Sequence, residues 1–192
     1  MVIGLMGGVG CGKSTVMNYL EKTYGAYIIE ADQVAKEIMN PGNEVYHKIV
    51  ETFPEVIQNG KIDRKSLADI VFASEEKLAK LNAITHPGTI KEIMKLIAIA
   101  ENDIIVLESA ILLGSGLENY CDELWFVYCS LETRIKRLMD NRGYSREKCI
   151  SIINNQPKDE EYNACADEYI DNSYSEEKTR EQIDLILRKI DC

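Results

Sequence analysis

A glycine-rich segment near the amino terminus is the part of this sequence best suited to chemistry. Residues 7–14 read Gly-Gly-Val-Gly-Cys-Gly-Lys-Ser and satisfy the pattern G-x-x-x-x-G-K-[ST]. In such a loop the glycines let backbone N–H groups converge on phosphate oxygens, and the helix that follows directs its partial positive charge at the same place. The segment therefore predicts a phosphate-binding loop (P-loop) for ATP and Mg²⁺.

The pattern gives each residue of the loop an expected role. Lys13 should bridge the β- and γ-phosphates, and Ser14 offers the hydroxyl by which a P-loop holds Mg²⁺. The alternative is a glycine turn that only caps a helix. Cys11 is expected to be a tolerated small residue, with a redox role as the alternative because a helix N-terminus lowers the pKa of a thiol. The residues expected to bind ATP are Gly8, Val9, Gly10, Cys11, Gly12, Lys13, Ser14 and Thr15.

Two acidic residues follow predicted strands and are candidates for the reaction itself. Asp32, in Ile29-Glu30-Ala31-Asp32, could accept the proton of an attacking hydroxyl group. Glu108 ends a strand at the position from which an acid usually reaches the metal through water. Both lie at the carboxyl ends of predicted parallel strands, the edge where open α/β sheets bind ligands. The alternative for each is a helix cap.

Basic residues and one histidine complete the candidates. Arg64 and His86 stand near expected helix boundaries, and each could equally be an ordinary polar residue there. A basic cluster further along the chain would supply positive charge for a phosphorylated ligand, or else form a solvated helix face. This cluster consists of Arg134, Lys136, Arg137 and Arg142.

The predicted elements alternate in a way that would position these residues. An apolar run at 2–6 predicts a buried strand, and apolar spacing after the P-loop predicts a helix over 13–24 that ends at Gly25. The alternation of strands and helices is typical of an α/β fold with a parallel sheet. Further strands are predicted at 26–29, 103–107, 123–129 and 168–170, and further helices at 31–39, 131–139, 145–155 and 175–190.

The middle of the chain, roughly 43–100, has mostly helical patterns and no strand of convincing length. Helix breaks are predicted at Phe53-Pro54, Asn59-Gly60 and His86-Pro87. Such a helical insertion is where a kinase often holds its second substrate. The segment 137–165, with a polar turn predicted at 140–144, is a candidate lid.

Composition excludes several classes of protein. With 192 residues, 45% of them hydrophobic, the chain can fold as one compact domain without disulfide or metal. Its six cysteines form no Cys-x-x-Cys pair and it has two histidines, so no zinc site is expected and the thiols should be reduced. A net charge of −10 argues against binding to nucleic acid or membranes. The first residues do not resemble a signal peptide, and we expect a soluble, cytoplasmic protein.

Seven segments together resemble the dephospho-CoA kinase family over nearly the whole chain. In order, they are GLMGGVGCGKSTV, IIEADQVAKEI, NGKIDRKSLADIVF, LNAITHPGTI, VLESAILLGSGLENYCDELWFVY, REKCISIINNQ and ADEYIDN. The resemblance implies a three-layer P-loop NTPase fold with a parallel central sheet, a helical substrate-binding insertion and a lid. It would divide a single domain, 1–192, into a core (1–42, 101–136 and 166–192), a helical CoA-binding part (43–100) and a lid (137–165).

The resemblance also implies a reaction: transfer of the ATP γ-phosphoryl group to the ribose 3′-hydroxyl of dephospho-CoA, in a monomer or weak homo-oligomer. Asp32 becomes the general base, and Lys13 and Ser14 hold phosphate and metal. The implied catalytic residues are Asp32, Lys13, Arg137 and Arg142. The implied residues of the acceptor side are Asp32, Lys36, Arg64, His86 and Glu108, and those of the metal site are Ser14 and Glu108.

The chain departs from the family's usual residues at several positions. Glu30 replaces the first Asp of a D-A-D element, and Lys36 replaces an Arg, which loses the bidentate fork that suits phosphate. Further departures are Met6 for Thr, Gly114 for Glu, and Asn141 and Ile152 for Arg. They concern the phosphate clamp more than the reaction class.

Three other functions remain open on the sequence. An adenylate- or shikimate-type kinase would keep the P-loop and change only the acceptor. A nucleotide-binding switch or ATPase-like regulator would have no acceptor, although the absence of an N-K-x-D element argues against a GTPase. A pseudoenzyme would bind CoA precursors without phosphoryl transfer.

Overall fold

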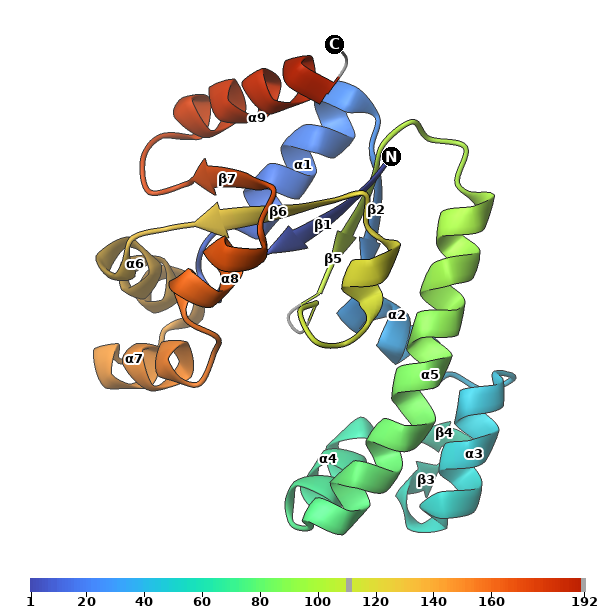
Figure 1. The fold of residues 1–192 in the computed structure, drawn as a ribbon. Coiled ribbons are helices and arrows are strands. Elements are labelled where there is room, and N and C mark those ends of the chain that lie inside the picture. Colours follow the sequence, from blue (N-terminus) through green and yellow to red (C-terminus); the bar gives the residue numbers. More distant parts are fainter. Residues whose placement is uncertain (110–111, 191–192) are drawn as a thin grey trace. The chain divides into compact units, whose positions relative to one another are not determined.

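The computed structural model describes residues 1–109 and 112–190 (Figure 1). The chain divides into two compact units, one made of Met1–Ile28 with Glu101–Cys192 and the other of Ile29–Ala100. The first unit carries most of a central sheet with its covering helices. The second unit is mainly helical.

The central sheet has five strands in the order β2-β5-β1-β6-β7. Strand β1 pairs in parallel with both β5 and β6, and β6 pairs in parallel with β7. All five residues of β1 are buried because the strand is central and covered on both faces, which explains its unbroken apolar run. The strands are β1 (Val2–Met6), β2 (Tyr27–Glu30), β5 (Ile105–Glu108), β6 (Glu123–Tyr128) and β7 (Glu168–Asp171).

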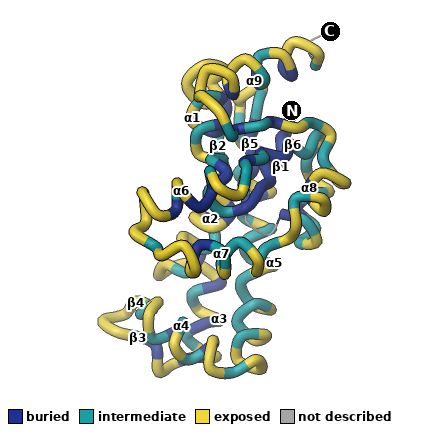
Figure 2. Tube along the Cα trace, turned by 90° about the vertical axis from the view of Figure 1, so that its left-hand side faces the viewer, coloured by how far each residue is buried: buried dark blue, intermediate teal, exposed yellow. Residues whose placement is uncertain are grey.

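Helices cover both faces of this sheet. On one face, α1 (Lys13–Tyr24) and α9 (Glu176–Ile190) bury Leu20 and Ile183 in a cluster with Leu5 and Trp125. On the other face, Tyr162 of α8 (Asp159–Cys165) stacks on Phe126 of β6, with ring centroids 5.3 Å apart. Figure 2 shows that buried residues gather along β1 and β6. The expected parallel α/β fold is confirmed.

Two further helices, α6 (Leu131–Arg142) and α7 (Arg146–Asn154), lie between β6 and α8 in the chain. A polar turn was predicted at 140–144, but α6 continues to Arg142, so the break between α6 and α7 covers only 143–145 and the predicted start of the turn is wrong. Gly143 ends α6 in the left-handed conformation, with φ of 63°. The polar residues before Gly143 are exposed on the last turn of the helix, and only the glycine is a stop signal. The short 3₁₀ helix η2 spans Leu117–Tyr120.

The second unit contains the helical insertion. Its elements are α2 (Ala31–Glu37), α3 (Glu44–Thr52), η1 (Pro54–Val56), β3 (Ile57–Gln58), β4 (Lys61–Ile62), α4 (Arg64–Phe72) and α5 (Glu75–Ile99). The expected break at Asn59-Gly60 is the turn of a β3–β4 hairpin, since both residues have positive φ, 52° and 74°.

The predicted helix break at His86-Pro87 is wrong, because α5 runs through both residues for 25 residues in all. Proline removes one backbone donor, yet α2, α3 and α4 all pack against α5 and stabilise it. Gly88 assists this packing, since a Cβ there would collide with Val45 of α3. Tertiary packing therefore overrides the local signal of the proline. Among the described residues, no helix is both long and apolar enough to cross a lipid bilayer.

Replacing Leu5 with Ala should lower the free energy of unfolding by about 2–5 kcal/mol, because a cavity would remain at a position that is 0% exposed. Urea denaturation followed by the fluorescence of the single tryptophan, the buried Trp125, measures the change. The control Leu185→Ala, on the exposed side of α9, should alter it by less than about 0.5 kcal/mol. Equal effects of the two substitutions would contradict this description of the core.

Candidate functional site

The predicted P-loop connects β1 to α1 and has the backbone that its glycines permit. Gly10 and Gly12 have φ of 80° and 86°, in the left-handed region that favours glycine. Among residues 1–109 and 112–190, no acceptor binds the backbone N–H groups of Gly12, Lys13 and Ser14. These N–H groups lie at the N-terminus of α1, where the helix dipole favours an anion. The loop can therefore bind phosphate oxygens with its main chain.

The carbonyl groups of the loop are bound from its outer side. Arg134 of α6 donates from Nε to Val9 O at 3.0 Å, and Arg137 donates from Nη1 to Cys11 O at 3.2 Å. Asn172, just after β7, donates from Nδ2 to Cys11 O at 2.7 Å. Side chains from two distant parts of the chain thus fix the orientation of the loop's peptide groups.

Lys13 and Glu108 meet at the carboxyl edge of the sheet, where the sequence predicted Glu108 to lie. The Lys13 ammonium lies 3.3 Å from Glu108 Oε1 and donates to Gly7 O at 2.8 Å. Both side chains are largely buried, at 15% and 13% exposure. Glu108 is the last residue of β5, and Ser14 is exposed in the first turn of α1. The site therefore offers a cation for phosphate and two types of oxygen ligand for a metal.

The chemistry of these oxygen ligands suits Mg²⁺. This ion prefers oxygen and keeps several waters, so it is bound by one or two protein groups plus phosphate rather than by a full protein cage. In the part of the chain that the structure describes, no three His, Cys, Asp or Glu side chains gather as a metal-binding group. The Ser14 hydroxyl and the Glu108 carboxylate fit a Mg²⁺ site that has one or two protein ligands and is completed by phosphate and water.

The basic cluster divides into buried and exposed members. Arg134 is 4% exposed and Arg137 is half-buried, and both contact the P-loop, whereas Lys136 and Arg142 are exposed. The alternative of a solvated helix face thus describes only part of the cluster. Arg142 lies in the last turn of α6.

The redox alternative for Cys11 finds no support in its surroundings. Cys11 is 0% exposed, and burial raises its pKa although the charges of Arg134 and Lys13 oppose the rise. A raised pKa leaves the thiol protonated at neutral pH and unreactive. Cys11 is therefore a small buried residue of the loop.

The remaining predicted residues belong to the second unit. Asp32 is exposed in the first turn of α2, whose N-cap is Glu30, so the helix-cap alternative for Asp32 is wrong. Arg64 donates from Nη2 to Lys36 O at 2.9 Å, which joins the start of α4 to the end of α2. His86 is exposed on α5 at one end of a shallow apolar hollow. Its lining residues are His86, Pro87, Ile90, Lys91, Met94, Lys95 and Ala98.

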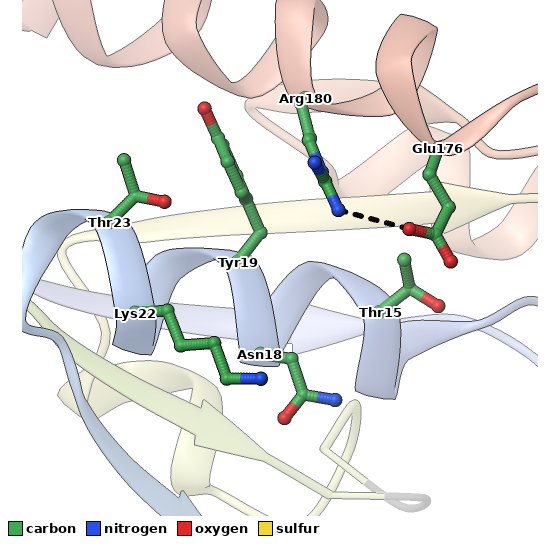
Figure 3. A pocket seen from close by; sticks show the side chains of 7 residues that line it. All are labelled: Thr15, Asn18, Tyr19, Lys22, Thr23, Glu176 and Arg180. Carbon is green, nitrogen blue, oxygen red and sulfur yellow. Dashed lines mark hydrogen bonds and ion pairs between the residues drawn. The ribbon is translucent and has the colours of Figure 1, made fainter.

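A polar pocket of about 450 Å³ begins beside the P-loop at Thr15 and continues between α1 and α9 (Figure 3). Arg180 of α9 lies over the ring of Tyr19, 5.5 Å from its centroid, and donates to Glu176 at 3.0 Å. The pocket is lined by Thr15, Asn18, Tyr19, Lys22, Thr23, Glu176 and Arg180. It adds polar surface next to the expected nucleotide site.

Sequence reasoning did not assign Arg134, Gln156 or Asn172 to the site. Gln156 accepts a hydrogen bond from Val9 N at 2.8 Å, and Asn172 is held by a hydrogen bond from Thr179 Oγ1 at 2.8 Å. Arg134 was noted only as part of the basic cluster, and the other two lie within segments that carried the family resemblance. Their contact with the P-loop depends on the tertiary fold.

Comparison with known proteins agrees with these observations. A family model described as Dephospho-CoA kinase matches residues 1–178. A dephospho-CoA kinase of Carboxydothermus hydrogenoformans is 44% identical, over 98% of this chain and 93% of the relative. Among solved structures, one from Thermus thermophilus has 28% identity and a TM-score of 0.83, covering 98% of this chain and 97% of that one. The dephospho-CoA kinase from Campylobacter jejuni has 25% identity and a TM-score of 0.67, covering 98% and 96%.

Cys11 should resist alkylation in the folded protein, whereas Cys165, which is exposed, should react. A maleimide reagent at pH 7.5, followed by peptide mapping, measures both rates in one sample. Because the pKa of Cys11 is raised, its thiolate fraction stays small until the pH is well above neutral. Labelling of Cys11 as fast as Cys165 in the native protein, with both reacting in urea, would contradict the buried position.

Proposed function

The chain belongs to the dephospho-CoA kinase family, and from this premise we propose that its P-loop delivers the ATP γ-phosphoryl group to the ribose 3′-hydroxyl of dephospho-CoA, giving CoA and ADP. The observation that carries the proposal is the P-loop with Lys13 and Glu108 at the sheet edge, in a chain matched by the family over 1–178. The same match favours this acceptor over those of adenylate- or shikimate-type kinases. We expect a cytoplasmic enzyme that works as a monomer or weak homo-oligomer.

The nucleotide side of the reaction uses the loop and Lys13. The N–H groups of Gly12, Lys13 and Ser14 donate hydrogen bonds to phosphate oxygens. An ammonium group has three donors, so Lys13 can keep its contacts with Gly7 O and Glu108 and still donate its third N–H to a γ-phosphate oxygen, while its positive charge acts on both the β- and γ-phosphates. Ser14 and Glu108 would hold Mg²⁺, which when bound neutralises charge on the phosphates.

The acceptor side uses the second unit. Asp32 takes the proton of the 3′-hydroxyl as its oxygen bonds to phosphorus, and the bond from phosphorus to the ADP oxygen breaks. Its exposed carboxylate, which caps no helix, supports this role. Lys36, Arg64 and His86 are the proposed contacts of the CoA precursor.

Arg137 and Arg142 are proposed to supply positive charge near the phosphates, and Arg142 also belongs to the segment that would close over the site. Arg137 holds the P-loop from outside and adds positive charge near the phosphates. Arg142, exposed at the end of α6, lies within the proposed lid segment 137–165 and would reach the transferred group when the lid closes. Closure excludes water, which would otherwise accept the phosphoryl group.

The direct test incubates purified protein with Mg-ATP and dephospho-CoA and follows the product by mass spectrometry. The proposal predicts a product heavier by one phosphate, with ADP formed in equal amount. ATP binding without any phosphorylated product would support a regulator or a pseudoenzyme instead. Transfer to adenylate or shikimate would identify one of the other kinases.

Lys13→Ala should reduce kcat by about 10²- to 10³-fold, because it removes the charge that stabilises the transferring phosphoryl group. A coupled assay of ADP formation measures kcat, and the control Lys136→Ala, at an exposed lysine of α6, should give the wild-type rate. Near-normal turnover of the Lys13 variant would refute the proposed nucleotide site.

Asp32→Asn should leave ATP affinity unchanged and lower kcat by about 10²- to 10⁴-fold, because the amide cannot accept the proton. Calorimetry gives the affinity and the coupled assay the rate. Glu37→Gln, at the other end of α2, is the matched control and should behave as wild type. Comparable rates for Asp32→Asn and the control would remove Asp32 from the role of base.

A further inference from the structure

The segment that joins α7 to α8 reaches the outer side of the P-loop through Gln156. Its Oε1 accepts two hydrogen bonds, from Val9 N at 2.8 Å and from Arg134 Nη2 at 3.2 Å. A neutral amide oxygen has two lone pairs, so these donors use its full capacity. One side chain thus links the P-loop and α6 to the segment between α7 and α8.

Arg134 closes this arrangement into a ring. Its Nε donates to Val9 O at 3.0 Å, and its Nη2 donates to Gln156 Oε1. Gln156 binds the N–H of Val9 and Arg134 binds the C=O of Val9, so both backbone groups of this residue are bound. The Nη1 of Arg134 lies 3.4 Å from Asp159 Oδ1 in the first turn of α8. The two side chains therefore bracket Val9 from either end.

The packing shows that this bracket is built into the loop. A Cβ on Gly8 would collide with Nη2 of Arg134 and would lie 2.7 Å from its Cζ. Arg134 is 4% exposed, and a buried guanidinium needs acceptors for its donors, which Val9, Gln156 and Asp159 supply. Its Nε, Nη1 and Nη2 each donate to one of these acceptors, so Arg134 is placed to hold the backbone of the loop.

We infer that Gln156 and Arg134 are positioning residues of the nucleotide site, which hold the backbone of Val9 so that the following N–H groups of the P-loop meet the triphosphate. The inference rests on the proposed function, because it takes the ligand to be ATP. The hydrogen bond from Val9 N to Gln156 also anchors the carboxyl-terminal part of the proposed lid segment to the P-loop.

Gln156→Met tests the inference because methionine keeps the length of the side chain and removes the acceptor. The Kd and the KM for ATP should both rise about tenfold, since Val9 N and Arg134 each lose a partner. The KM for dephospho-CoA should stay within about twofold, because no contact of Gln156 is to the proposed acceptor residues. Asn154→Ala, an exposed residue at the end of α7, is the matched control and should equal wild type.

Two further variants separate positioning from a general loss of structure. Gln156→Glu keeps an acceptor oxygen at the same reach and should restore ATP affinity to within about threefold of wild type. Combining Arg134→Lys with Gln156→Met should weaken ATP affinity no more than the larger single effect, because both side chains act through the backbone of the same residue, Val9.

Unchanged ATP affinity in Gln156→Met would overturn the inference. So would an equal rise of KM for both substrates accompanied by a lower melting temperature, since that pattern indicates general destabilisation. If the wild-type protein itself bound no ATP, the proposed function would fail and this inference with it; wild-type binding with an unaffected variant refutes the inference alone.

Discussion

A loop that keeps the N–H groups of Gly12, Lys13 and Ser14 open for a ligand needs its other backbone groups bound by the rest of the protein. Unpaired buried carbonyls are costly, and here the donors come from α6 and from the residue after β7. Asn172 is itself fixed by Thr179 of α9, so that several elements far apart in sequence determine one short loop. The phosphate-binding geometry is therefore a property of the whole first unit.

The glycines of the P-loop have two roles in this geometry. Gly10 and Gly12 supply the positive φ that the backbone requires. Gly8 and Gly12 also leave room for the groups that bind the carbonyls, because a Cβ at either position would collide with Arg134 or Asn172. The largely buried Lys13–Glu108 pair joins the start of α1 to the end of β5 and places both charges at the ligand-binding edge of the sheet.

Local signals predicted the parts of the fold that local physics controls. The apolar run of β1, the P-loop pattern and Gly25 gave the first strand and helix with their correct ends. Pro87 was misleading because packing of three helices on α5 outweighs one missing hydrogen bond. Lys13 was predicted from the P-loop pattern and Glu108 from its place at the end of a strand. The roles of Arg134 and Gln156 were not predicted from the sequence. Both side chains contact Val9, which lies 125 and 147 positions earlier in the chain.

Amide hydrogen exchange across the P-loop tests the central claim most directly, with the protein alone and with saturating Mg-ATP. The N–H groups of Gly12, Lys13 and Ser14 lack protein acceptors in the described structure, so they should exchange quickly without nucleotide and slow strongly when phosphate oxygens bind them. Bound nucleotide that leaves exchange at these residues unchanged, and protects another segment instead, would contradict the account.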